Sequence, residues 1–245
     1  MNSDAVVIIP ARISSRRLER KMLQMIGSKT MIEHVLFRIN RIKVCRVFVA
    51  TDSEEIFLLV NKVGGVAIMT EKNCLTGTDR VHEALKKIPN YKRIKYIVSV
   101  QADMPFIDES IVLQIIRGLK NNKADMMTAV VTVSKKIADS ESNVKVVIDK
   151  NNNALYFSRS LIPNGSSNFL YHLGIYGFRL DALERFVSLE QSRNEKTESL
   201  EQLRALDNGI SIGVCHSKEI PISVDTEKDL ELARQFLLKN SQYLI

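Results

Sequence analysis

Short apolar runs alternate with amphipathic segments through the first half of the chain. The aliphatic run Ala5–Ile9 is typical of a strand buried on both faces. Similar runs predict strands at Val44–Thr51, Val66–Met69 and Tyr96–Gln101. Helices are predicted between and after them: one that opens with a capping box at Thr30-x-x-Glu33, one that Asp52-x-x-Glu55 opens, then Asp79–Ile88 and Asp108–Lys120. This alternation predicts an α/β fold with a doubly wound, mostly parallel sheet, which binds ligands at the carboxyl ends of its strands.

The pattern changes near residue 125, where strands follow one another without helices. Such strands are predicted at Met126–Val133, Val144–Asp149, Ala154–Ser158 and Leu170–Phe178. Helices resume at Glu198–Leu206 and Thr226–Leu238. We therefore expect a strand-rich, antiparallel insertion that forms a second lobe or a dimer contact.

The composition of the 245 residues is that of a globular protein, with 45% hydrophobic and 26% charged residues. Ala5–Ala11 is the longest apolar run and is far shorter than the roughly 20 residues of a membrane span. Because no basic segment precedes it, a secretory signal is not expected and a cytoplasmic location is. The three cysteines form no CxxC and read as reduced thiols, and the four histidines lack metal-site spacing.

The formal net charge of +7 favours an anionic partner. Nucleic acid, a membrane surface and a polyphosphate all carry such charge. Only 6% of the residues are aromatic, which argues against a nucleic-acid surface with interleaved stacking residues. A basic loop concentrated at one sheet edge would instead favour the polyphosphate.

The loop Ala11–Lys21 is such a segment, because it follows the first strand and holds five cations in ten residues. Its lack of glycine excludes a P-loop or a GxGxxG turn. Cations at this edge suit a triphosphate, although a solvated basic loop has the same composition.

Two aspartates occupy comparable places. Asp103 follows the aliphatic strand that ends near Gln101, and Asp225 precedes the helix predicted at Thr226. Each fits a Mg²⁺ ligand beside a polyphosphate. Asp103 equally fits a cap of its turn. For Asp225 the local sequence favours helix capping, although Thr226 could cap the same helix. The loop Leu75–Arg80 offers backbone amides to a base or phosphate, or an ordinary N-cap at Thr78.

Taken together, these segments resemble the 3-deoxy-manno-octulosonate (Kdo) cytidylyltransferases from Val6 to about Phe236. Ala11–Met22 matches the family's A-R-x-x-S-[ST]-R-L-P-G-K-P, Thr76–Arg80 its S-G-T-[DE]-R, and Gln101–Pro105 its Q-G-D-x-P. Further along the chain, Ala154–Arg159, His172–Tyr176, Leu200–Arg204 and Val224–Thr226 match A-L-Y-F-S-R, H-L-G-[IV]-Y, L-E-Q-L-R and V-D-T.

The resemblance implies a Mg²⁺-dependent homodimer that makes CMP-Kdo and pyrophosphate from CTP and Kdo, for lipopolysaccharide assembly, with no nucleic-acid or membrane partner. It implies that Asp103 and Asp225 hold the metal and that Arg12 and Lys21 act with them in catalysis. The nucleotide would be bound by Ala11, Arg12, Ser15, Arg17, Lys21, Thr76, Gly77 and Arg80. The sugar would be bound by Gln101, Arg159, His172, Tyr176, Glu201 and Gln202.

The resemblance also implies a nucleotide-diphospho-sugar transferase fold of the Rossmann-like type. Within a single domain, 1–124 would bind CTP, 125–215 would bind sugar and dimerise, and 216–245 would be a returning strand and helix with the second metal carboxylate.

The chain departs from the family pattern at four places, two of which are Arg16 in place of a small hydroxyl residue and Met104 in place of an acidic or amide residue. Pro-Gly-Lys-Pro is replaced by Glu19-Arg20-Lys21-Met22, which changes the stiffness and backbone freedom of the phosphate loop. Ala102 replaces the glycine before the metal aspartate. The alternatives are a sister enzyme for 8-amino-Kdo or a sialic-acid-like sugar, and a CTP-binding homologue without turnover.

Overall fold

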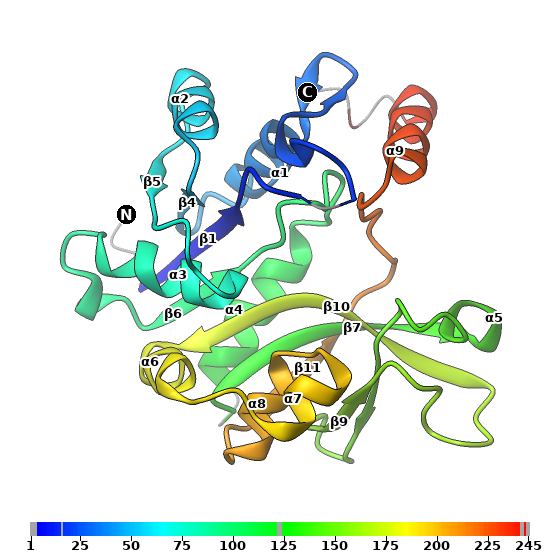
Figure 1. Ribbon diagram of the computed structural model, residues 1–245. Helices are drawn as coiled ribbons and strands as arrows, with labels where there is room; N and C mark the ends of the chain where they lie inside the picture. Colours follow the sequence, from blue (N-terminus) through cyan, green and yellow to red (C-terminus); the bar gives the residue numbers. More distant parts are fainter. Residues whose placement is uncertain (1–3, 16, 122–123, 241–242, 244–245) are drawn as a thin grey trace. The chain divides into compact units, whose positions relative to one another are not determined.

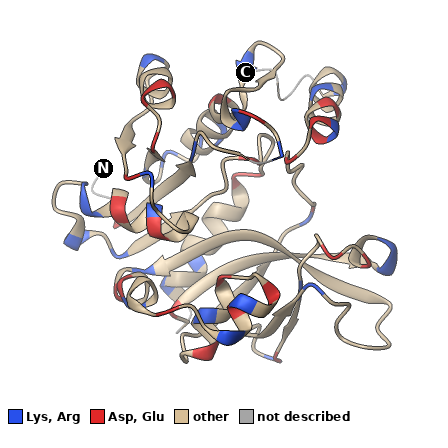
Figure 2. Ribbon diagram, viewed as in Figure 1, with Lys and Arg blue, Asp and Glu red and all other residues tan. Residues whose placement is uncertain are grey.

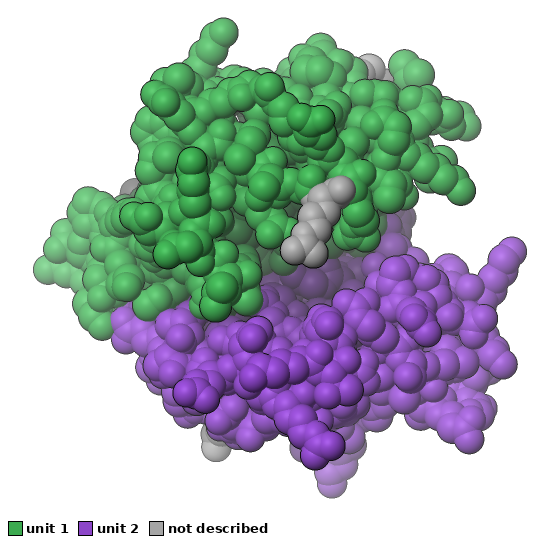
Figure 3. Space-filling view, in the orientation of Figure 1, with its two compact units in different colours: residues 1–110, 221–245 green, residues 111–220 purple. Residues whose placement is uncertain are grey.

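A computed structural model describes residues 4–15, 17–121, 124–240 and 243. The chain divides into two compact units, of which one comprises residues 1–110 and 221–245 and the other residues 111–220 (Figure 3). The functional division into 1–124, 125–215 and 216–245 stays a prediction. None of the helices in the described ranges is both long enough and apolar enough to cross a membrane.

The first unit is built on four parallel strands (Figure 1). Their spatial order is β6 (Tyr96–Ser99), β1 (Ala5–Ala11), β4 (Arg46–Thr51) and β5 (Ala67–Met69). Residues 6–9 of β1 are completely buried, as their aliphatic run predicts. The expected α/β class with a mostly parallel sheet is confirmed.

Three helices connect these strands: α1 (Met31–Asn40), α2 (Glu54–Lys62) and α3 (Gly77–Lys86). The capping box of α1 is confirmed, since the amide and hydroxyl of Thr30 each donate to Glu33 Oε2 at 2.7 Å. The predicted opening of α2 at Asp52 is wrong by one residue. Ser53 is its N-cap and accepts from the Ile56 amide, which leaves the Asp52 carboxylate available elsewhere.

The strand pattern misses a small hairpin beside the basic loop. After the 3-10 turn η1 (Lys21–Leu23), β2 (Met25–Ile26) pairs with β3 (Lys29–Thr30). Gly27 has a φ of +64°, which its two-residue turn requires, and a Cβ there would lie 2.6 Å from Leu237. Helix α9 (Glu227–Lys239) therefore packs on this hairpin. A second 3-10 turn, η2, covers Tyr91–Arg93.

In its described residues, the second unit holds most of α4 (Ser110–Asn121) and five strands. Strands β7 (Met126–Ser134), β10 (Asn168–Arg179), β8 (Lys145–Ile148) and β9 (Ala154–Ser158) pair antiparallel in that order. This confirms the strand-rich antiparallel insertion. The remaining strand, β11 (Ile212–His216), pairs in parallel with β7.

The remaining helices of this unit are α5 (Lys135–Ala138), α6 (Leu180–Ser188), α7 (Arg193–Glu198) and α8 (Gln202–Asp207). A single helix predicted over Glu198–Leu206 is wrong, because Ser199 has a φ of +54° and separates α7 from α8. The strand expected within 216–245 is also wrong. Strand β11 ends at His216, and the chain continues without regular structure until α9.

Candidate functional site

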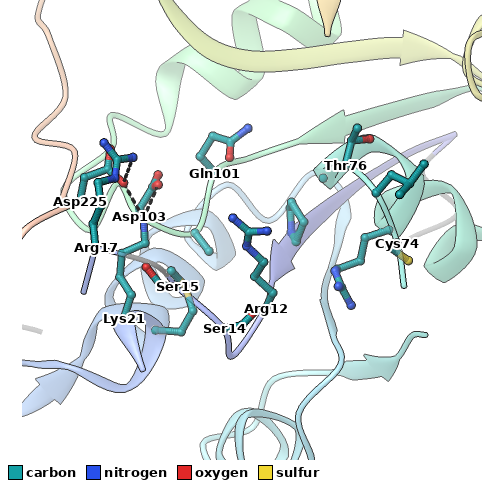
Figure 4. A pocket seen from close by; sticks show the side chains of 16 residues that line it. Arg12, Ser14, Ser15, Arg17, Lys21, Cys74, Thr76, Gln101, Asp103 and Asp225 are labelled. Atoms are coloured by element: carbon teal, nitrogen blue, oxygen red, sulfur yellow. Dashed lines mark hydrogen bonds and ion pairs between the residues drawn. The ribbon is translucent and has the colours of Figure 1, made fainter. Parts of the chain in front are cut away.

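A pocket of about 490 Å³ lies in the first unit, lined by residues that follow β1, β5 and β6 and by Asp225 before α9 (Figure 4). The chain runs from β1 outward to β4 and β5 and then returns to β6 on the other side of β1. Parallel sheets bind ligands where the strand order reverses in this way. Predicted site residues that line the pocket are Arg12, Ser15, Arg17, Lys21, Thr76, Gly77, Arg80, Gln101, Asp103 and Asp225. Ala11 is buried as the last residue of β1.

Lys21 lies between the two aspartates. Its Nζ is 2.8 Å from Asp103 Oδ2 and 3.0 Å from Asp225 Oδ1, and Arg17 Nη2 is 2.9 Å from the same Asp225 oxygen (Figure 4). Burial alone would lower the pKa of Lys21, but its ion pairs with both aspartates outweigh burial and raise it. Lys21 is therefore a fixed positive charge.

The capping alternative for Asp225 is wrong. Thr226 is the N-cap of α9 and accepts from the Asp229 amide at 3.3 Å, while Asp229 Oδ2 accepts from the Thr226 amide at 2.9 Å. Asp225 is consequently left to face the pocket. The Val224 amide donates to the Asp103 carbonyl at 2.9 Å, which holds the two aspartate segments together.

Two converging carboxylates match the donors that Mg²⁺ takes from a protein, the remaining ligands being phosphate and water oxygens. A larger donor set is absent from the described residues, where no three His, Cys, Asp or Glu side chains gather as metal ligands. The pair therefore fits a Mg²⁺ that arrives with a polyphosphate. It does not fit a permanently held structural metal.

Arg12 is exposed and makes no hydrogen bond or ion pair with any residue in the described ranges. Its guanidinium is available to a ligand, as are the remaining N–H groups of Arg17. A further loop cation, Arg16, lies outside the described residues. Along the helices, Lys and Arg are interspersed with Asp and Glu (Figure 2). The helices therefore do not form a long, purely basic surface. The positive charge concentrated in the loop Ala11–Lys21 accounts better for the binding of an anion.

Arg80 lines the pocket but is only 4% exposed, and three groups already hold its guanidinium. It donates to Asp52 Oδ2 at 3.0 Å, to Thr70 Oγ1 at 2.6 Å and to the Glu71 carbonyl at 3.2 Å. The other oxygen of Asp52 accepts from the Ile13 amide at 3.0 Å. Arg80 thus supports the basic loop Ala11–Lys21 through Asp52, a role that the predicted place of Asp52 at the opening of a helix does not suggest.

The Thr76–Arg80 segment forms the first turn of α3. Thr76, not Thr78, is the N-cap, and its amide and hydroxyl each donate to Asp79 Oδ2 at 3.0 Å. A Cβ on Gly77 would lie 3.6 Å from Pro10, an ordinary contact distance. Cys74, which lies outside the matched motifs, also lines the pocket and donates to Glu83 Oε2 at 3.2 Å. Burial, followed by that bond, raises the pKa of its thiol to about 11.

Residues predicted for the sugar lie in the second unit, apart from Gln101. His172 and Tyr176 come from β10, with ring centroids 5.4 Å apart despite a bulge between them. Thr128 Oγ1 donates to the Ile175 carbonyl at 2.7 Å, so it must accept from His172 Nε2 at 2.9 Å. Burial lowers the pKa of His172 to about 3. The ring is therefore neutral, with its proton on Nε2.

Tyr176 and Gln202 form a buried pair, in which the phenol donates to Gln202 Oε1 at 2.9 Å. Burial, and then the charge of Glu201, raises the pKa of Tyr176 well above its ordinary value. The amide nitrogen of Gln202 is buried without a hydrogen-bond partner in the described part of the chain. A buried, unpaired donor beside a phenol suits a polar ligand.

Arg159 is held by backbone carbonyls. Its Nε donates to Glu198 at 2.8 Å and its Nη1 to Glu141 at 3.2 Å, which leaves further N–H groups on the Nη atoms. The Arg159 backbone is fixed as well, because its carbonyl accepts from the buried Lys145 at 2.5 Å and its amide donates to Glu198 Oε2 at 2.9 Å. Lys145 and Glu198 stand outside the matched motifs, and only tertiary contacts reveal them.

Comparison with known proteins agrees with this geometry. Residues 6–220 match the family model described as Cytidylyltransferase. The 3-deoxy-manno-octulosonate cytidylyltransferase of Rickettsia bellii (strain OSU 85-389) is 54% identical over 239 residues, 98% of each chain. That of Rickettsia rickettsii (strain Sheila Smith) is 56% identical over 230 residues, 94% of this chain and 95% of its own.

A solved structure of CMP:2-keto-3-deoxy-manno-octonic acid synthetase complexed with CTP superposes with a TM-score of 0.92. It is 36% identical and covers 97% of this chain and 100% of its own. The likeness extends through both units, so it includes the strand-rich insertion as well as the parallel sheet. The chain therefore belongs to the cytidylyltransferase family, and within it to the 3-deoxy-manno-octulosonate cytidylyltransferases.

Proposed function

We propose that this enzyme transfers CMP from CTP to the anomeric hydroxyl of Kdo and releases pyrophosphate. The observation that carries the proposal is the meeting of Lys21, Asp103 and Asp225 in one cationic pocket at the strand-order reversal. The names of the similar proteins state these substrates.

The first unit supplies the groups that a triphosphate needs. Arg12 is unpaired within the described ranges, while Arg17 and Lys21 carry positive charge from the same loop. Charge that develops on the phosphates during in-line displacement is stabilised by fixed cations of this kind. Since Asp52 and Arg80 hold the loop, these cations are positioned before the nucleotide arrives.

Asp103 and Asp225 would hold Mg²⁺ together with phosphate oxygens. The ion, when bound, would supply positive charge and a lowered pKa for the attacking hydroxyl. The residues on β10 are consistent with such a reaction. His172 is neutral and Tyr176 keeps its proton, so they act as hydrogen-bonding groups and not as a general base.

For the acidic sugar we propose the second unit's residues Arg159, His172, Tyr176, Glu201 and Gln202, with Gln101 from the first. The free N–H groups of Arg159 suit a sugar carboxylate. Gln202 supplies the unpaired donor for a hydroxyl. A cytoplasmic location and a homodimer complete the proposal. The free state of all three cysteines supports the former, and the family resemblance supports the latter.

The test is pyrophosphate release from CTP and Mg²⁺ with Kdo, 8-amino-Kdo or N-acetylneuraminate. We expect release with Kdo that a chelator abolishes. Release with only another sugar would move the assignment to a sister enzyme. Calorimetric CTP binding without release would indicate a homologue that has lost turnover.

A further inference from the structure

The phosphate loop contains a left-handed residue that is not glycine. Arg20 has φ 50° and ψ 37°, directly before Lys21. The resembling family has glycine at this position, which adopts such angles without steric cost. For an L-residue the same angles are unfavourable and persist only where the surroundings impose them.

The other glycine replacement in the pocket has no such cost. Outside glycine, left-handed backbone in the described ranges occurs at Arg20, Lys43, Asn90, Asn152 and Ser199. Ala102 is not among them, so its side chain meets no backbone penalty. Among the two glycine replacements, both of which lie in the described ranges, the backbone strain is therefore confined to Arg20.

The side chain of Arg20 has a specific partner. Its Nη2 donates to Glu55 Oε1 in the first turn of α2, and both side chains are about half exposed. The same end of α2 holds the start of the loop, because Asp52 accepts from the Ile13 amide at 3.0 Å. The segment that opens α2 thus holds the loop at both ends, by Asp52 just before the N-cap and by Glu55 in the first helical turn.

Further bonds close the turn itself. Gln24 Nε2 donates to the Glu19 carbonyl at 2.9 Å, and the Leu23 amide donates to the Arg20 carbonyl at 2.8 Å. These bonds need only backbone carbonyls at 19 and 20, so they do not depend on which side chain stands there. The Arg20–Glu55 pair is the contact that the arginine adds.

We propose that the Arg20–Glu55 ion pair is a positioning device that takes the place of the family's glycine. It holds the left-handed turn that delivers Lys21 to Asp103 and Asp225, and so prepares the pocket for the nucleotide. The inference rests on the proposed function for its catalytic meaning. The coupling between residues 20 and 55 in nucleotide binding can be measured without turnover.

A double-mutant cycle tests the device with E55A, R20G and the combined variant, and E54A is a matched control from the same helix turn. We measure the KM for CTP in pyrophosphate release and, separately, CTP affinity by calorimetry without sugar. E55A is expected to weaken both about threefold to fivefold, the effect of one exposed ion pair. R20G is expected to stay within about twofold of the parent, because glycine adopts the turn unaided.

The decisive comparison is E55A in the R20G background, where we expect less than about a twofold effect. An equal loss in both backgrounds, or an equal loss from E54A, would overturn the device. If no sugar supports pyrophosphate release, the proposed function fails while the calorimetric cycle still decides the coupling. Circular dichroism melts of all four variants identify any that fail to fold, and E55Q, which removes the charge at nearly constant side-chain size, then replaces E55A in the cycle.

Discussion

Lys21 donates to Asp103 at 2.8 Å, although 82 positions of sequence separate them. The same ammonium donates to Asp225 at 3.0 Å. Two carboxylates that share one place repel each other unless a cation lies between them. In this structure Lys21 is that cation. The residue that the family resemblance assigns to phosphate binding also holds together the two carboxylates that we propose as metal ligands.

Replacement of Lys21 by methionine removes this cation at nearly constant side-chain length. We expect turnover to fall by roughly 10²- to 10³-fold, which is the usual effect of removing one group that stabilises charge in the transition state. Calorimetry without CTP should show tighter Mg²⁺ binding than in the parent, because the aspartates lose the ammonium that competes for them. Mg²⁺ affinity equal to the parent's would show that Lys21 does not compete with the ion.

Asp103→Asn and Asp225→Asn should each lower pyrophosphate release by at least roughly 10²-fold, because each removes a proposed metal ligand. CTP affinity measured in a chelator should stay equal or become tighter, since a negative charge leaves the triphosphate pocket. The exposed Glu227 is the control, and E227Q should resemble the parent. Full activity in either aspartate variant would remove that residue from the metal site.

Arg80 and Asp52 form an ion pair whose side chains are 4% and 7% exposed. Arg80→Met leaves a buried carboxylate unpaired and should cost about 3 kcal/mol of unfolding free energy. For a chain of this size, the melting temperature would fall by about 6–12 °C. D52N with R80M should cost less than the sum of the single variants in denaturant titration. If the stability losses of the two single variants add up to that of the double variant, Asp52 and Arg80 are not coupled.

His172 should make stability depend on pH. Its folded pKa of about 3 lies below the unfolded value near 6.5, so on acidification the unfolded chain takes up this proton first. The contribution is complete above pH 6.5 and is lost as pH falls toward 3. Between pH 7 and pH 5 the loss is about 2 kcal/mol.

Urea unfolding at the two pH values measures this loss. H172Q should flatten the dependence by about that amount, while the exposed His216 supplies the control H216Q. If H172Q and the parent lose stability in parallel, the buried ring is not the source of the dependence.

Much of the fold follows from local pattern. Ala5–Ile9 is aliphatic throughout, and a strand covered on both faces is the structure that satisfies such a run. The spacing of Thr30 and Glu33 specifies a capping box within one turn. The Glu198–Leu206 prediction fails because the left-handed Ser199 carries no compositional signal that distinguishes it from a helical serine.

The candidate site could be predicted from the sequence only in part. The basic loop after the first strand, and aspartates at the ends of predicted elements, are visible in the sequence. Whether Asp225 caps a helix or faces a ligand is not, since Thr226 performs the capping and only the folded chain shows it. Asp52 is the opposite case, because a residue that the sequence places at the start of a helix instead links Arg80 to the basic loop.

The sequence by itself determined the strands, the helices and the chemical character of the loops, because these depend on residues within a few positions of one another. Tertiary structure alone decided that Lys21 meets Asp103 and Asp225, and that Arg20 meets Glu55. These contacts depend on the order of strands in the sheet, which brings distant loops to one edge. No local periodicity carries that information.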